Sequence, residues 1–358
     1  MKKHDPSLQR QQLAEQRRKV DFDTYDVTVE ELVRRVERSR IEIAPVYQRQ
    51  FRWDSVRQSR LLESLLLGIP IPPLFMATNL APDKQAQWEV VDGLQRLLTL
   101  VNFIGDEKAR GIAKLKDAPL RLKNLEKLSE LEDSTFAELP EDIRTALEDR
   151  PVKVIVLNDK SDLQVRFDLF ERLNTGGIAL TDQEVRECVF RGEFMDLLSI
   201  LAHTDDFKTV VRLPKPSWKD GTPEDYVLRF FAFLEGYKSF EHSVKDFLNT
   251  FTESAAIDPK VRERETIFRE AFCYLADAFP NGIKSRKGMT PVNLFEGVAV
   301  GAALAIRNNP TLTKPENDGW VRSEKLRKLT TGATNSRPRV IGRVEFSRDR
   351  FLGIPEDV

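Results

Sequence analysis

Hydrophobic residues recur at two different spacings along the chain and divide it into two parts. Short apolar runs typical of buried strands occur at 74–78, 88–91 and 152–157, all in the first half of the sequence. Apolar residues three or four positions apart, the spacing of a helical face, occur between these runs and through almost all of the chain after residue 180. The pattern therefore predicts a small α/β unit followed by a helical region, which makes the whole chain α+β.

The strand predicted at 88–91 meets a helix predicted at 94–104 through Asp92 and Gly93. Asp92 is expected to cap the helix, and Gly93 lets the chain turn sharply. The unpaired N–H groups of the helix start, with Gln95 and Arg96 in the first turn, would form a cradle for a phosphate. An ordinary capped turn with a surface arginine explains the same residues, and on these residues alone it is favoured by about two to one.

A second segment with candidate chemistry lies at 46–53, where Tyr47, Phe51 and Trp53 alternate with Arg49 and Arg52. Arginines among aromatic rings indicate a site for a phosphate or a base, or arginines whose stems cover packed rings, and the two interpretations are equally weighted. Asp54 then caps a helix predicted over 55–67.

A third segment follows a helix predicted to begin near Ser161. The run Asn174-Thr175-Gly176-Gly177 indicates a left-handed helix end that allows close approach of another group. Thr181 and Glu184 form a capping box for the next helix. Capping does not explain Asn174 and Thr175, and Arg186 is a secondary candidate.

The predicted domain organisation has three parts. Residues 1–21 form a basic arm, and 22–177 form the α/β domain with a helical insertion at about 107–150. Residues 178–358 form the helical domain, in which five phenylalanines are expected in the core: Phe230, Phe231, Phe233, Phe268 and Phe272. Its last forty residues are rich in lysine and arginine, and this makes Arg337, Arg339 and Arg343 the candidate DNA contacts.

Composition narrows the functions that the chain can have. Its 358 residues contain 56 Lys and Arg against 57 Asp and Glu, so nucleic-acid binding requires local clustering of charge. Two distant cysteines and three scattered histidines form no disulfide framework and no metal centre, and no Gly-x-x-x-x-Gly-Lys-Ser/Thr loop is present. With no export signal and no apolar run long enough to span a bilayer, a cytoplasmic location is expected.

Four motifs taken together resemble the N-terminal domain family of GmrSD-type, modification-dependent restriction systems. They are Val46-Tyr47-Gln48-Arg49-x-Phe51-x-Trp53, the leucine-rich and proline-rich run at 62–74, Val90-Val91-Asp92-Gly93-x-Gln95-Arg96-Leu97, and Arg172-Leu173-Asn174-Thr175-Gly176-Gly177. The segment 335–340 is also similar to that family. The ordered set is far more specific than any one motif, and it shifts the interpretation of Asp92 to Arg96 towards a nucleotide site.

The resemblance implies a ParB/sulfiredoxin-like nucleotide-binding domain followed by a helical region, in a prokaryotic anti-phage setting. It implies DNA, including modified phage DNA, as a partner, and a nucleoside triphosphate, with Mg²⁺ as a candidate companion ion, as the cofactor. The family motif is Asp-Gly-Gln-Gln-Arg, and its third position here is Leu94. One polar contact is therefore absent, which weighs against hydrolysis more than against binding.

The resemblance also assigns roles to single residues. Asp92, Gln95 and Arg96 would act in catalysis, by orienting a metal-bound water and stabilising phosphate charge. The phosphate-binding set would be Gln48, Arg49, Arg52, Gly93, Asn174, Thr175 and Gly176. Because the chain contains no His-Asn-His nuclease motif, cutting would need a separate nuclease protein. The alternatives are a DNA-binding adaptor without turnover and a stand-alone nuclease.

Overall fold

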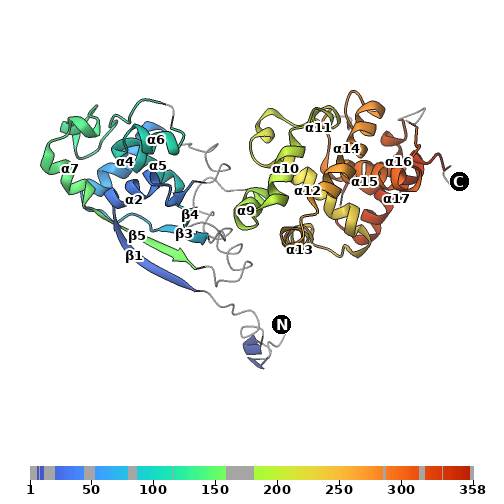
Figure 1. Cartoon of the computed structure of the whole chain (residues 1–358), viewed down its shortest axis with the longest axis horizontal. Helices are drawn as coiled ribbons and strands as arrows, with labels where there is room; N and C mark the ends of the chain where they lie inside the picture. The colour runs from blue at the N-terminus through green and yellow to red at the C-terminus, as the bar shows by residue number, and fades with distance from the viewer. Residues whose placement is uncertain are drawn as a thin grey trace. The chain divides into compact units, whose positions relative to one another are not determined.

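The computed structural model describes residues 6–7, 9–11, 21–43, 53–79, 87–115, 117–158, 181–284, 288–313, 319–332 and 334–354. Contacts within the chain divide it into two compact units, Met1–Ala179 and Leu180–Val358. The first holds a sheet with helices and the second is helical, so the predicted α+β class is confirmed (Figure 1).

The first unit is built on a mixed five-stranded sheet with the strand order β1-β5-β3-β4-β2. The strands are β1 (Phe22–Thr28), β2 (Ile41–Glu42), β3 (Leu74–Asn79), β4 (Gln87–Asp92) and β5 (Pro151–Leu157). β5 pairs antiparallel with β1 and parallel with β3, and β4 pairs antiparallel with β3 and parallel with β2. The three apolar runs of the sequence are thus three neighbouring strands, β5, β3 and β4.

Helices α2 (Val29–Glu37), α4 (Ser55–Leu66), α5 (Leu94–Ile104) and α6 (Glu107–Ile112) lie together on one side of this sheet (Figure 1). α5 contacts α2, α4 and β3, and nearly all of its residues are buried. The predicted cap of α4 is confirmed, because Asp54 accepts a hydrogen bond from the Arg57 N–H. At the start of α2, Thr28 likewise accepts one from the Glu31 N–H. Local sequence therefore fixes where α2 and α4 begin.

The predicted helical insertion at 107–150 is only partly helical. α6 and α7 (Glu141–Glu148) lie near its two ends, and the described chain between them contains two 3-10 turns, η1 (Ser129–Leu131) and η2 (Phe136–Glu138). The reason is that side-chain carboxylates, and not the carbonyl groups of a helix, accept the hydrogen bonds of the N–H groups in this segment. The buried carboxylate of Glu63 in α4 accepts bonds from the N–H groups of residues 126–128, and Glu132 accepts from those of Asn124 and Leu125. These N–H groups are not available to a helix.

The second unit consists of helices and 3-10 turns in its described residues. The helices are α9 (Asp182–Val189), α10 (Glu193–Ala202), α11 (Asp205–Val210), α12 (Thr222–Gly236), α13 (Val244–Ile257), α14 (Val261–Ala278), α15 (Val292–Asn308), α16 (Glu324–Thr330) and α17 (Arg337–Phe351). The 3-10 turns are η4 (Lys215–Trp218), η5 (Tyr237–Ser239) and η6 (Gly319–Arg322). The capping box of Thr181 and Glu184 at the start of α9 is confirmed.

The core of the second unit forms around α12 and α15, which contact each other. The phenylalanines expected in the core are there, and the Phe268 and Phe272 rings of α14 stack with centroids 3.9 Å apart. α17 crosses α15 closely at Gly301, where an added Cβ would lie 2.6 Å from the Cβ of Ser347. Any larger residue at position 301 would push the two helices apart.

No helix among the described residues has the length and apolar character needed to cross a membrane.

Candidate functional site

The junction between β4 and α5 turns at Gly93, which occupies the N-cap position of the helix. Its φ of 97° and ψ of 13° are left-handed. A Cβ at this position would lie 2.4 Å from Cδ2 of Leu74 and 3.0 Å from Nη2 of Arg96. Glycine is therefore required twice, for its backbone conformation and for the close packing around it.

Arg96 is held in place by two acceptors. Its Nη2 donates to Oδ2 of Asp92 at 2.6 Å, and its Nη1 donates to the carbonyl oxygen of Pro72 at 2.9 Å. Only 9% of Arg96 is exposed, so the expectation of a surface arginine is wrong. It is buried because the segment before β3 passes over the first turn of α5 and offers the Pro72 carbonyl to the guanidinium. Arg96 thus ties three parts of the domain together.

Asp92 does not cap α5, contrary to the sequence-based expectation. It is the last residue of β4, one position before the N-cap residue, and no side chain caps this helix. Its carboxylate instead accepts from Arg96, while 30% of its side chain stays exposed. The result is a carboxylate oriented by a buried guanidinium and open to solvent.

Gln95 connects this junction to the segment that precedes α4. Its Oε1 accepts from the N–H of Trp53 at 3.2 Å, and the carbonyl oxygen of Trp53 accepts from Nε2 of Gln58 at 2.9 Å. Oε1 of Gln58 in turn accepts from Nδ2 of Asn102 at 2.9 Å. Trp53 is the last residue of the arginine-aromatic run and the one residue of that run that the structure describes, so the end of the run lies against the first turn of α5.

Sequence reasoning missed Gln58 and Asn102, although both carried a signal. Each is buried on a helix whose inward face is otherwise mostly apolar. A buried amide needs hydrogen-bond partners, so two such amides on predicted neighbouring helices indicate a contact between them.

The remaining residues of the predicted nucleotide site lie outside the described residues. They are Gln48, Arg49, Arg52, Asn174, Thr175 and Gly176. The convergence of all three segments on one cleft therefore stays a prediction, supported on one side by the bond between Gln95 and Trp53.

The chemistry available at the junction is that of a helix start beside an oriented carboxylate. A helix start is a place where backbone N–H groups can donate to an anion. Among the described residues, no group of three or more His, Cys, Asp or Glu side chains could hold a metal ion.

The three arginines proposed as DNA contacts differ in their surroundings. Arg337 is exposed, and Arg339 is half-buried with its Nη1 donating to the carbonyl oxygen of Thr331 at 2.9 Å. Arg343 is fully buried and pairs with Glu296, so its prediction as a surface contact is wrong. Position 343 lies on the face of α17 that packs against α15, where Glu296 supplies the opposite charge.

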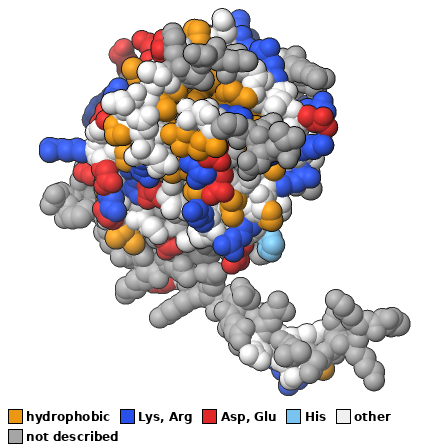
Figure 2. Space-filling model, turned by 90° about the vertical axis from the view of Figure 1, so that its right-hand side faces the viewer, with side chains coloured by type: hydrophobic (Ala, Val, Ile, Leu, Met, Phe, Trp, Pro, Cys, Tyr) orange, Lys and Arg blue, Asp and Glu red, His pale blue; other side chains and the backbone are white. Residues whose placement is uncertain are grey.

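Figure 2 shows one face of the molecule, from the side on which Figure 1 places α16 and α17. Lys and Arg side chains are spread around this face among acidic and hydrophobic ones, and they do not form one continuous patch. If DNA binds to this face, individual Lys and Arg side chains, and not one continuous basic patch, would contact its phosphates.

Arg343 belongs to a buried ionic network that the sequence did not reveal. Asp225 pairs with Arg186 at 3.1 Å and with Arg229 at 2.5 Å, and Glu296 pairs with Arg229 at 2.8 Å and with Arg343. Burial lowers the pKa of Arg186, whereas for Arg229 the opposing effect of burial is outweighed by the two carboxylates, which raise its pKa. The network joins α9, α12, α15 and α17.

Comparison with known proteins gives one finding, which covers most of the first unit and the start of the second. Residues 29–191 match the family model described as GmrSD restriction endonuclease, N-terminal domain. The matched segment begins with α2, contains the Asp92 to Arg96 junction, and ends just after α9. No curated protein and no solved structure is significantly similar to the chain.

Proposed function

Because residues 29–191 match the N-terminal domain of GmrSD-type restriction systems, we propose that the protein is the nucleotide-regulated, DNA-binding component of a prokaryotic anti-phage system. The nucleotide is a nucleoside triphosphate bound with Mg²⁺ at the start of α5. The partners are DNA, including modified phage DNA, and a separate nuclease protein. The observation that carries the proposal is the Asp92 carboxylate, exposed beside a helix start and oriented by buried Arg96.

In this proposal the residues of the junction have different tasks. Gly93 makes the left-handed turn that sets the start of α5 directly after Asp92, and Asp92 would orient a magnesium-bound water. Gln95 holds the end of the arginine-aromatic segment in place through Trp53. Arg96 positions Asp92 from behind and contributes positive charge to the site. Gln48, Arg49, Arg52, Asn174, Thr175 and Gly176 complete the phosphate-binding set.

A second candidate function is supported by Leu94. This residue takes the place of the first glutamine of the family motif, and its side chain is buried in the core. It therefore offers no polar atom to a phosphate or a water. A DNA-binding adaptor that binds the triphosphate without hydrolysing it would fit this change.

The test is calorimetry of the full chain with each of the four ribonucleoside triphosphates and Mg²⁺, combined with a phosphate-release assay. We expect saturable binding of at least one triphosphate. Asp92→Asn should reduce phosphate release about a hundredfold, the order of effect of removing one preorganised catalytic group. This variant retains an oxygen that can accept from Arg96, so the fold should persist.

Glu30→Gln is the matched control. Like Asp92, Glu30 pairs with an arginine four residues later in the chain, here Arg34, but it lies on α2 and is not part of the junction. It should leave binding and phosphate release unchanged. Binding without release in the wild-type protein would favour the adaptor. Absence of heat with every triphosphate, with and without DNA, would overturn the nucleotide site.

A further inference from the structure

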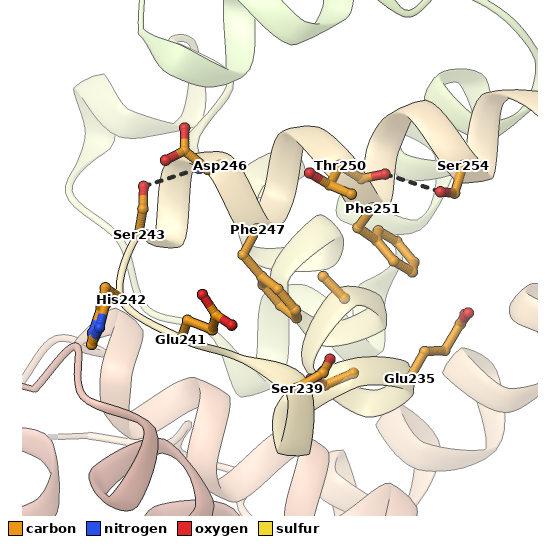
Figure 3. A pocket seen from close by; sticks show the side chains of 12 residues that line it. Glu235, Ser239, Glu241, His242, Ser243, Asp246, Phe247, Thr250, Phe251 and Ser254 are labelled. Atoms are coloured by element: carbon orange, nitrogen blue, oxygen red, sulfur yellow. Dashed lines mark hydrogen bonds between the residues drawn. The ribbon is translucent and has the colours of Figure 1, made fainter. Parts of the chain in front are cut away.

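A groove of about 590 Å³ opens on the second unit between the C-terminal part of α12, η5 and one side of α13 (Figure 3). It is remote in sequence from the β4–α5 junction and takes no part in the function proposed above. Its volume is within the range of sites that bind ligands or partner side chains.

The floor of the groove is aromatic. Phe247 and Phe251 point from α13 towards the segment that carries Glu235 and Ser239 (Figure 3). Both rings are only half-buried, although each also contacts core aromatic rings. One side of α13 therefore presents two half-buried aromatic rings, four residues apart, to the groove.

The rim of the groove is acidic. Glu241 and Asp246 are exposed, and their carboxylates have no partner among the described residues. Glu235, the third carboxylate, pairs with Arg264, whose guanidinium lies over the Phe251 ring at 5.3 Å. Among the lining residues only His242 could carry a positive charge. The groove thus combines apolar rings with unneutralised negative charge.

We propose that this groove binds a basic amphipathic helix of a partner protein. The partner helix places apolar side chains at positions i and i+3 or i+4 on Phe247 and Phe251, and its lysines or arginines face Glu241 and Asp246. From Asp246 to Ser254 the lining residues of α13 extend for about 12 Å at 1.5 Å per residue, which matches about two turns of a partner helix. Charge complementarity selects the basic sequence, and the apolar floor supplies affinity.

The test uses the full chain and a fluorescein-labelled synthetic helix with leucines on one face and lysines on the other. Fluorescence anisotropy should show saturable binding that weakens with added salt. A scrambled peptide of the same composition, which has no apolar face, should bind much more weakly. Glu241→Gln with Asp246→Asn should weaken binding about tenfold, because two close charge pairs are removed.

A second pair of variants blocks the groove without touching the core. Thr250 and Ser254 are exposed and line the groove, so Thr250→Arg with Ser254→Arg should abolish binding while the melting temperature stays near wild type. Glu253→Gln and Ala256→Arg are the matched controls, since both residues are exposed on α13 outside the groove. They should leave binding unchanged.

Equal binding of the ordered and scrambled peptides, or unchanged binding by both groove variants, would overturn the proposal. So would a homodimer of the wild-type protein that Thr250→Arg with Ser254→Arg converts to a monomer, because a second copy would then be the occupant. Loss of binding in both groove variants, with retention in both controls, supports the partner helix.

Discussion

At the β4–α5 junction, the sequence predicts the conformation of one residue, Gly93, but not the burial of another, Arg96. The need for glycine at position 93 is visible locally, since a strand has to turn into a helix there. The burial of Arg96 is not, because it depends on the carbonyl oxygen of Pro72, twenty-four positions earlier. A charged residue in a first helical turn is usually exposed, and only the distant contact reverses this expectation.

Replacing Arg96 by alanine should lower the stability of the first unit. The change removes a charge-assisted hydrogen bond to Asp92 and a second bond to the Pro72 carbonyl oxygen, at a cost of about 1–3 kcal/mol. Chemical denaturation followed by circular dichroism measures the difference. Arg57→Ala is the control, because Arg57 is exposed on α4 and its removal should change stability by less than about 0.5 kcal/mol. Equal stabilities of the two variants would contradict a structural role for Arg96.

At the scale of elements, the three central strands β3, β4 and β5 and the caps of α4 and α9 followed from the sequence, and the segment from 113 to 140 did not. Leu122, Leu125, Leu128 and Leu131 have helical spacing, yet α4 supplies the carboxylate of Glu63 to the N–H groups of this segment. Spacing predicts a helix only when no other acceptor competes for the backbone. Such an acceptor, more than sixty residues away, leaves no mark in the local pattern.

The bonds to Glu63 should make stability depend on pH. Burial alone would raise the pKa of Glu63, but the N–H groups of Lys127, Glu126 and Leu128 outweigh it and lower the pKa below its ordinary value of 4.5. The carboxylate therefore stabilises the fold fully above pH 4.5, and this contribution is lost as the pH falls through the lowered value. Glu63→Gln should be less stable than wild type by about 2 kcal/mol at neutral pH.

The two proteins should converge in stability in acid, where Glu63 is protonated. Urea denaturation over a series of pH values tests this. Glu130→Gln, at an exposed residue of the same segment, should follow the wild-type curve. A constant difference between Glu63→Gln and wild type at every pH would show that the charge of Glu63 does not matter.

At the scale of the whole molecule, the sequence revealed the order of the two units and the local excess of basic residues near the C-terminus. It could not show which of these arginines face the solvent. The apolar positions of α17 alternate with arginines, so Arg343 has no distinguishing mark until α15 places Glu296 against it. A segment that is rich in arginine in the sequence can therefore contain both solvent-exposed arginines and arginines buried in ion pairs.

DNA binding should distinguish these two classes of arginine. Arg337→Ala with Arg339→Ala should lower the slope of log affinity against log salt by up to about 0.9 for each phosphate that the variant no longer binds. Arg343→Lys keeps the charge beside Glu296 and should leave the slope unchanged. Anisotropy titrations of a labelled DNA duplex over a range of salt concentrations measure both. An unchanged slope in the double variant would exclude this end of α17 as the DNA-binding surface.

The pairing of β1 with β5 has a consequence for how the protein is made. Phe22 lies opposite Leu157, so β1 leaves the ribosome long before its neighbour in the sheet exists. At about 5 to 20 residues per second, the interval is roughly 7 to 27 s. During that time β1, with its exposed Phe22 and Tyr25, is an unpaired strand that other nascent chains can join. We therefore expect the nascent first unit to bind chaperones until β5 has been synthesised and pairs with β1.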